Sequence, residues 1–402
     1  MPTSQSSVRA VLPVLGGLVL VALALRPQVI GIGPLLPAIR ADLDISHGVA
    51  GLLATIPVLC MGVFAPLGPR FARAVGPRRA IALCVAAIAG FGLARALAPG
   101  APAVLLLTFG IGLGMGAAGP ILSMVVRLRA SGIPALATGA YAAGIVLGAL
   151  IAAAVAVPLA GPDGTWRLAF AIFSLAALAS LAAWVVLVPP ETTATRPDVR
   201  GLRLPWRSAT AWALALVFGL QSLLYYAVVA WLPNVYVERG WTEGDAANLI
   251  AAMHAVGLGS TIGVPLVADR LGSRRGQLTV AAVGSLVATA GVIGAPDLAF
   301  AWASLLGLSL GAIFPLALTL PVDVSNDATE VGATAALMLL AGYVLSAVGP
   351  VGLGIARDVT GDFGASLWLL VGLAAALVGS CWALSPARLR RGIRRAAQHS
   401  AG

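Results

Sequence analysis

Long apolar runs follow one another along the whole chain, separated by short segments rich in proline, glycine and charge. Runs of about 20 apolar residues are long enough to cross a hydrocarbon core of ~30 Å. Backbone groups in lipid must be satisfied within the segment, which favours helices, and the strict alternation of a membrane β-barrel is absent. The pattern predicts twelve membrane helices at residues 11–36, 49–72, 79–98, 102–126, 134–158, 166–188, 208–236, 246–268, 276–294, 298–320, 329–355 and 363–385.

A proline- and arginine-rich loop, residues 189–207, divides these helices six and six. Each half carries a similar segment after its second helix, PLGPRFARAVGPRR at 66–79 and PLVADRLGSRR at 265–275. Many secondary carriers are built from such repeats, with the substrate bound near the membrane midplane where the repeats meet. We predict an all-α integral membrane protein with six-helix bundles at 1–188 and 208–387, a cytoplasmic linker at 189–207 and a basic cytoplasmic tail at 388–402.

Composition excludes a soluble protein, because only 10% of the 402 residues are charged and 59% are hydrophobic, against about 25% charged in soluble domains. A net charge of +10 would suggest nucleic acid for a soluble protein, but the 25 basic residues are all arginine and lie mostly between helices. There they orient the helices. With the N-terminus inside, nineteen fall on the cytoplasmic side. We therefore expect a monomer in the bacterial inner membrane, with both termini cytoplasmic and the bilayer, not nucleic acid, as partner.

The segment DRLGSRR, from Asp269 to Arg275, resembles the loop motif of the major facilitator superfamily. Asp269 at a helix end can pair with arginines and a neighbouring helix N-terminus and so hold a cytoplasmic gate in one state. In the first-half copy Pro69 stands where the aspartate is expected. The resemblance implies a gating set that we complete with two residues suited to helix bending: Asp269, Arg270, Gly272, Arg274, Gly349 and Pro350.

A closer resemblance is to the cyanate and 2-nitroimidazole transporter branch of that superfamily. It is carried by segments in both halves: LRPQVIGIGPLLPAIRADL, LLATIPVLCMGVFAPL, FGLQSLLYYAVVAWLP, FPLALTLP and GYVLSAVGPVGLGIARDVTGD. The resemblance implies a carrier of a small solute that works by alternating access. Positions expected to be polar in this branch are apolar here, around Gly119, Ala142–Ala143 and Leu339. A different or less polar ligand therefore stays open.

Ionisable residues inside a membrane are costly and usually functional. Arg26 lies in the first predicted helix, directly before Pro27 and the segment from Gly31 to Pro34. One interpretation has its side chain snorkelling to the outer surface. The other has it facing the central cavity, where a guanidinium offers a forked donor to an anion or a nitro group.

His254 on the eighth helix is the best proton-linked candidate, because histidine titrates near neutrality, although it also suits a core position bonded to a neighbour. Gln221 and Tyr225 on the seventh helix are spaced i,i+4 and share a face, and polar residues of this kind also serve as interhelical contacts. The complete set of predicted substrate-binding residues is Arg26, Gln28, Thr55, Tyr141, Gln221, Tyr225, His254, Phe314 and Tyr343. Phe314 and Tyr343 are suited to stacking on a flat heterocycle.

No clustered nucleophile, base or metal set appears in the sequence, so we expect no enzyme, no catalytic residue, no metal and no cofactor. Every Asp and Glu lies in a predicted loop or at a helix end. Transport by facilitated diffusion, by exchange, or by coupling through His254 is the resulting hypothesis. The alternatives are a multidrug or toxic-compound exporter of broader specificity and, more remotely, a receptor that binds without transporting.

Overall fold

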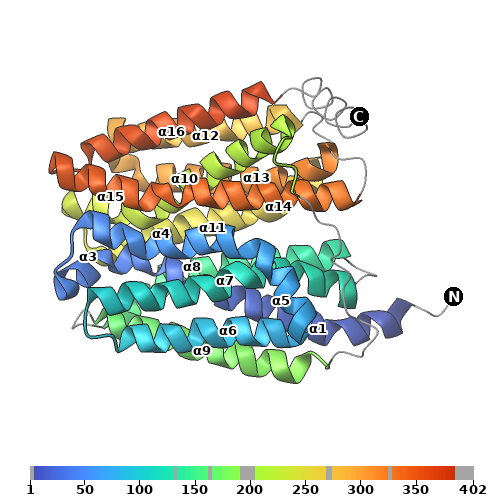
Figure 1. The fold of residues 1–402 in the computed structure, drawn as a ribbon. Coiled ribbons are helices and arrows are strands. Elements are labelled where there is room, and N and C mark those ends of the chain that lie inside the picture. The colour runs from blue at the N-terminus through green and yellow to red at the C-terminus, as the bar shows by residue number, and fades with distance from the viewer. Residues whose placement is uncertain are drawn as a thin grey trace. The chain divides into compact units, whose positions relative to one another are not determined.

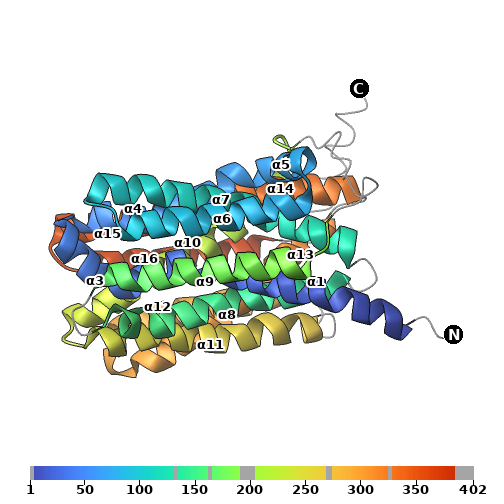
Figure 2. The same ribbon diagram turned by 90° about the horizontal axis from the view of Figure 1, so that it is seen from below.

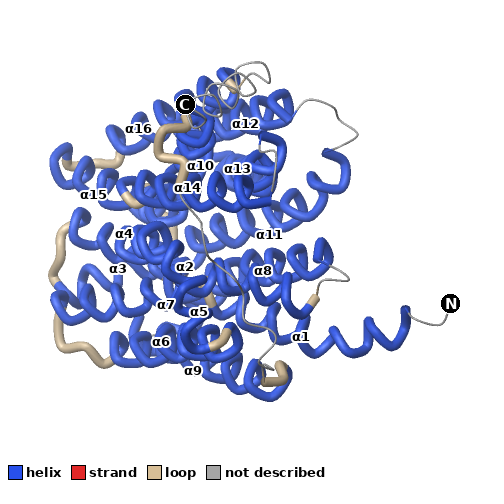
Figure 3. Tube along the Cα trace, turned by 45° about the vertical axis from the view of Figure 1, so that its right-hand side comes forward, coloured by secondary structure: helices blue, strands red, loops and turns tan. Residues whose placement is uncertain are grey.

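The computed structural model describes residues 4–130, 134–161, 165–190, 204–268, 274–324 and 328–384, and every regular element in these ranges is a helix (Figure 3). Twelve stretches among them are long and apolar enough to cross a membrane. Each predicted range overlaps one of these stretches. The predicted fold class, an all-helical protein with twelve membrane spans, is confirmed.

The helices gather into two compact units. Unit 1 comprises Met1–Ile45, Ile56–Val199 and Trp241–Asn248, and unit 2 comprises Ser46–Thr55, Arg200–Gly240 and Leu249–Gly402. Two helices are divided between them, because the start of α4 (His47–Phe64) belongs to unit 2 and the start of α11 (Glu243–Ala268) belongs to unit 1. The predicted domain limits, which keep each helix whole, stay a prediction.

Unit 1 contains most of the first six spans. Helix α6 packs against α7 and α9, and α1 packs against α8 and α9 (Figures 1 and 2). Its elements besides α4 are α1 (Ser4–Ala24), α2 (Pro27–Ile30), α3 (Ile32–Leu43), the 3-10 helix η1 (Ala65–Leu67), α5 (Gly68–Val75), α6 (Pro77–Ala96), α7 (Ala101–Arg129), α8 (Pro134–Ala160) and α9 (Trp166–Leu187).

Unit 2 repeats this packing plan. Helix α12 packs against α13 and α16, and α10 packs against α14 and α16 (Figure 1). In both units the third span therefore contacts the fourth and sixth, and the first contacts the fifth and sixth. The elements besides α11 are α10 (Ala209–Glu238), α12 (Arg274–Gly294), the 3-10 helix η3 (Pro296–Leu298), α13 (Ala299–Val324), α14 (Ala328–Ser346), α15 (Val348–Thr360) and α16 (Gly364–Ala383).

Glycine sets the closest helix contacts in each unit. A Cβ on Gly144 of α8 would lie 2.9 Å from the carbonyl oxygen of Val19 on α1, and one on Gly148 would collide with the carbonyl of Leu23. In unit 2 a Cβ on Gly342 of α14 would collide with the ring of Phe218 on α10. Small residues let helix backbones approach where the lipid supplies no hydrophobic driving force.

The first span is broken, although the sequence pattern predicts one continuous helix to residue 36. Helix α1 ends at Ala24, α2 begins at Pro27, and α3 continues to Leu43. Proline has no N–H for the helical hydrogen-bond ladder and its ring crowds the preceding turn, so the helix is interrupted immediately before Pro27. The break leaves Arg26 as the residue that caps α2.

Candidate functional site

Arg26 stands at the break between α1 and α2. Its side chain is half-buried, while the flanking Leu25 and Pro27 are buried. Membrane carriers bind substrates at such discontinuous helices, because the helix ends present unpaired backbone groups near the midplane. The structure thus places Arg26 at a feature typical of transport sites, and its ligand-binding role stays a prediction.

Gln28 is engaged in the packing of unit 1. Its Nε2 donates to Ser174 Oγ at 2.8 Å and to the Phe170 carbonyl at 3.3 Å, and its Oε1 accepts from Arg95 Nη2 at 2.7 Å. Arg95, only 2% exposed, also donates to Thr108 Oγ1 at 3.3 Å. A ligand at Gln28 would have to compete with these bonds.

Arg95 is a residue that sequence reasoning missed, because it lies near the end of the predicted helix at 79–98. The structure instead buries it in the last turn of α6, with its guanidinium carbon 4.3 Å from the ring centroid of Phe170. Gly92 on the same helix leaves room for this group, since a Cβ there would lie 2.7 Å from Gln28 Nε2. A buried arginine needs acceptors for its donors. Here Thr108 Oγ1, Gln28 Oε1 and the Gln28 carbonyl accept from Nη1 and Nη2, whereas the buried Nε has no hydrogen-bond partner among the residues that the structure describes.

In unit 2 the structure joins two predicted site residues directly. The Tyr225 hydroxyl on α10 lies 2.8 Å from His254 Nε2 on α11, and His254 Nδ1 lies 2.7 Å from the Ile250 carbonyl one turn earlier. His254 is 4% exposed. Every residue from Val217 to Tyr236 is buried except Tyr225, which is half-buried. In the hydrogen-bonded pair of Tyr225 and His254, the histidine is therefore buried and the tyrosine is partly accessible.

Three aromatic rings form a cluster around Phe218, which lies two turns before Tyr225 on α10. Phe218 on α10 lies edge-to-face with Tyr343 on α14 at 5.1 Å between ring centroids, and tilted against Phe314 on α13 at 6.2 Å. Phe218, Gln221 and Tyr225 are spaced i, i+3 and i+7, so they share one face of α10. Gln221 is buried and accepts a hydrogen bond from Ser222 Oγ at 3.2 Å.

A second break, in the eleventh span, brings Thr55 and Pro350 into the same region of unit 2. Helix α14 ends at Ser346 and α15 begins at Val348. Thr55 donates to the Ala347 carbonyl at this break at 2.7 Å, and Trp231 Nε1 donates to the Pro350 carbonyl at 2.7 Å. Gly349 permits close approach, since a Cβ there would lie 3.0 Å from the Leu223 carbonyl. The contacts suit a bending point.

Sequence reasoning missed a polar cluster at the start of α4. Asp358 Oδ1 accepts from the His47 backbone N–H at 3.0 Å and lies 2.8 Å from His47 Nδ1, and Asp358 Oδ2 accepts from the Gly48 N–H at 2.7 Å. Nearby, Arg357 Nε donates to Glu238 Oε1 at 2.9 Å. A carboxylate there satisfies the unpaired N–H groups of a helix N-terminus. The sequence signal that could have revealed this cluster is the presence of ionisable residues at three helix ends: His47, Glu238 and Asp358.

The remaining predicted residues lie elsewhere. Tyr141 of α8 hydrogen-bonds Ser123 of α7 through their hydroxyl groups at 3.0 Å. Arg274 begins α12. The other members of the loop motif, Asp269, Arg270 and Gly272, lie outside the described residues.

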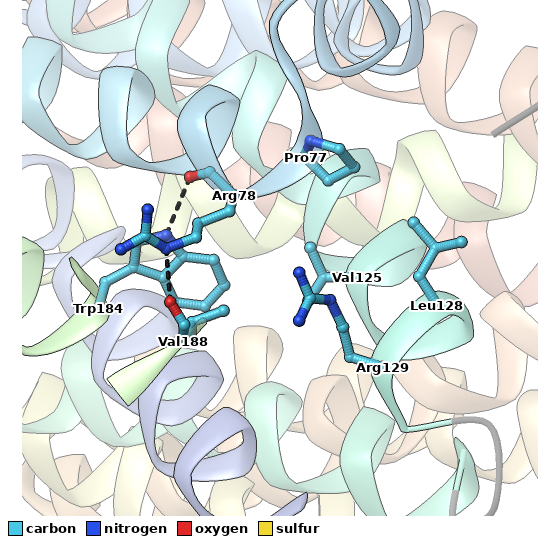
Figure 4. Close-up of a pocket in the computed structure, with 7 residues that line it drawn as sticks. All are labelled: Pro77, Arg78, Val125, Leu128, Arg129, Trp184 and Val188. Carbon is cyan, nitrogen blue, oxygen red and sulfur yellow. Dashed lines mark hydrogen bonds between the residues drawn. The ribbon is translucent and has the colours of Figure 1, made fainter. Parts of the chain in front are cut away.

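A small pocket in unit 1 carries two arginines that cap a helix (Figure 4). Arg78 donates to the Val185 and Val188 carbonyls at 2.6 and 2.5 Å, and Trp184 Nε1 donates back to the Arg78 carbonyl at 3.0 Å. Arg129 Nη2 donates to the Pro189 carbonyl at 3.1 Å. These bonds satisfy the terminal carbonyls of α9. The lining residues are Pro77, Arg78, Val125, Leu128, Arg129, Trp184 and Val188.

Among the residues that the structure describes, no group of three histidine, cysteine or acidic side chains is placed to hold a metal ion. The arrangement instead offers two kinds of ligand contact. Unit 1 presents a guanidinium at a helix break, and unit 2 presents a hydroxyl–imidazole pair beside aromatic rings.

Comparison with known proteins matches this chain to membrane transporters. The model of the Major Facilitator Superfamily matches residues 18–350. The chain is 32% identical to the cyanate transport protein CynX of Escherichia coli (strain K12) over 86% of this chain and 90% of that protein. It is 30% identical to the uncharacterized transporter YycB of Bacillus subtilis (strain 168), over 88% and 89%, and 28% identical to the 2-nitroimidazole transporter of Escherichia coli (strain K12), over 91% and 94%.

Solved structures show the same fold at low sequence identity. A D-xylose–proton symporter superposes with a TM-score of 0.78 at 16% identity, over 95% of this chain and 99% of that one. A bacterial homologue of the human lysosomal transporter Spinster superposes with a TM-score of 0.73 at 16% identity, over 98% of each chain.

Proposed function

Because this chain belongs to the Major Facilitator Superfamily, a family of membrane transporters, we propose that it carries a small anion such as cyanate, or a nitroimidazole-like heterocycle, across the bacterial inner membrane. Carriers built from two repeats work by alternating access, in which a fixed site is exposed to each side of the membrane in turn. The relatives' names support the substrate class, and the repeated packing plan of the two units supports the mode of transport.

The placement of Arg26 carries the substrate proposal. A guanidinium offers planar, forked donors that match an anion or a nitro group. Two further helices, α2 and α3, follow Arg26 before the turn at Asp44, which argues against a position at the membrane surface. An arginine at a helix break within the Leu12–Ile30 span is a feature expected of an anion site.

The aromatic cluster of Phe218, Phe314 and Tyr343 favours a second candidate, an exporter of flat, neutral compounds. Such a protein would bind heterocycles by stacking and would have no need of a guanidinium. Arg26 and the cluster therefore predict different ligand preferences, which one experiment can separate.

The test is ligand-induced thermal stabilisation of the purified protein, followed by uptake into vesicles of whichever compound stabilises it. The panel contains cyanate, small carboxylates and neutral nitroimidazoles, each against the parent and Arg26→Gln. A ligand at a hundred times its Kd stabilises the folded state by about 2.7 kcal/mol. We expect an anion to stabilise the parent and to lose that effect in Arg26→Gln. The exposed Arg239→Gln, at the end of α10, is the matched control and keeps it.

Stabilisation only by neutral heterocycles, equal in the parent and in Arg26→Gln, would contradict the anion proposal and support the exporter. Binding without any flux in vesicles would contradict a transport role altogether and leave a receptor.

A further inference from the structure

The hydrogen-bond partners of His254 determine where its proton lies in the neutral state. Nδ1 lies 2.7 Å from the Ile250 carbonyl, which can only accept, so Nδ1 carries the hydrogen. Nε2 of a neutral imidazole is then an acceptor, and the Tyr225 hydroxyl 2.8 Å away must donate to it. The single phenolic proton of Tyr225 is therefore committed to His254 whenever His254 is neutral.

Protonation of His254 reverses this bond. Both ring nitrogens of an imidazolium are donors, so Nε2–H then donates to the Tyr225 oxygen. The phenolic proton must leave the contact, and the hydroxyl becomes a donor for another group. The Tyr225 hydroxyl thus presents only acceptor capacity beside a neutral His254, and a donor beside a protonated one.

Tyr225 is placed to show this change to a ligand. It is the one side chain between Val217 and Tyr236 that is not fully buried, whereas His254 is 4% exposed. Because His254 is buried, a solute would contact the Tyr225 hydroxyl rather than the imidazole. The protonation state of His254 then determines whether that hydroxyl donates or accepts. The chemical difference between the two states is large, because an anion such as cyanate can only accept hydrogen bonds.

We propose that Tyr225 and His254 form a proton-responsive dyad that makes binding of an acceptor-only anion require the uptake of one proton. The proton enters from water and ends on His254 Nε2. The phenolic proton turns from Nε2 to the anion, tyrosine stays neutral, and no covalent bond in the ligand changes. This inference rests on the proposed function and deepens it, because it makes the carrier a proton–anion cotransporter.

The helices that pack against His254 carry few titratable side chains in the part of the chain that the structure describes. On α10 the titratable neighbours are Tyr225 and Tyr226, whose rings lie 5.0 Å apart between centroids. Helix α13 packs on the same part of α11, where a Cβ on Gly307 would collide with the Met253 carbonyl, and its residues from Ala299 to Pro321 include no ionisable side chain. On α11 itself the acidic residues, Glu243 and Asp245, stand at the start of the helix.

The test counts protons. Calorimetric titration of the purified full chain with potassium cyanate, in two buffers of different ionisation enthalpy, gives the number of protons taken up per anion. At a pH above the midpoint for protonation of His254 in the free protein we expect about one in the parent. There the cyanate Kd should rise about tenfold per pH unit, as linkage of one proton requires. Tyr225→Phe and His254→Gln should each lower the proton number to near zero. The neighbouring Tyr226→Phe should keep it.

Each outcome bears on one claim. Cyanate binding without proton uptake in the parent, or uptake that survives in both Tyr225→Phe and His254→Gln, would overturn the dyad while leaving the proposed substrate class intact. A parent that binds no small anion at any pH would instead contradict the proposed substrate class. Gel filtration of each variant confirms that it is folded before titration.

Discussion

Gln28 and Gln221 are both buried glutamines, but their hydrogen-bond partners differ. Gln28 joins three partners on other helices, one of them the buried guanidinium of Arg95. Gln221 bonds the hydroxyl of its neighbour Ser222 on the same helix. Hydrogen bonds to a buried charge contribute more than neutral ones, because the charge has lost its water. We therefore expect Gln28 to contribute more to the stability of unit 1 than Gln221 contributes to the stability of unit 2.

This difference predicts unequal costs for one substitution. Gln28→Leu keeps the size of the side chain but removes an acceptor from Arg95, and should destabilise the protein by about 1.5–3 kcal/mol. Gln221→Leu, the matched control, should cost about 1 kcal/mol or less. The measurement is the thermal unfolding midpoint of each purified variant without ligand. Equal shifts would show that the Arg95 bond contributes nothing beyond an ordinary neutral hydrogen bond.

At the scale of elements, close helix contacts depend on the positions of the glycines rather than on the glycine content of a helix. Gly148 of α8 faces the backbone of α1, where any Cβ would meet the Leu23 carbonyl. Gly139 on the same helix has nothing within 4 Å of an added Cβ. The first presents a flat surface to a neighbouring backbone. Gly139 makes no such contact and only increases the backbone entropy that is lost on folding.

Gly148 and Gly139 should therefore respond in opposite directions to substitution by alanine. Gly148→Ala forces α8 away from α1 and should destabilise unit 1 by about 1–3 kcal/mol, the usual cost of overpacking. Gly139→Ala should stabilise by about 0.5–1 kcal/mol through reduced backbone freedom in the unfolded chain. Thermal midpoints of the two variants check this, and destabilisation by both would contradict a specific close contact at Gly148.

At the scale of the whole molecule, the two units share one packing plan, with the third span against the fourth and sixth and the first against the fifth and sixth. Repetition of six spans puts the ends of both halves on the same side of the membrane. The distribution of arginine chooses which side that is, since basic loops stay in the cytoplasm. The repeat of six spans thus determines that both halves end on one side of the membrane, and the arginine distribution determines which side.

Reporter fusions test the orientation. A fluorescent protein fused after Gly402 should fluoresce in bacteria, and alkaline phosphatase at the same place should be inactive, because both would lie in the cytoplasm. Phosphatase fused after Gly240, in the predicted outer turn between α10 and α11, should be active and serves as the control. Active phosphatase after Gly402 would reverse the predicted topology.

The sequence by itself determined the number and places of the spans and the family. Each span is a local property, since some 20 apolar residues suffice to cross the bilayer whatever their neighbours are. Local chemistry also marked Gly349 and Pro350 as suited to helix bending, whereas the apolar pattern predicted an unbroken first span and missed the interruption before Pro27. The candidate residues were found by their cost in a membrane, which needs no knowledge of their partners.

Only the tertiary structure decided which partners those residues have. A membrane helix is apolar on all sides, so no periodic pattern tells which face meets which helix. Gln28, His254 and His47 each bond a partner on another helix. His47 and its partner Asp358 are 311 residues apart in sequence. Gln28 and Gln221 look equivalent in sequence, and only the contacts separate a structural amide from a possible ligand contact. A polar group in a bilayer has the role that its partner allows, because no water can replace that partner.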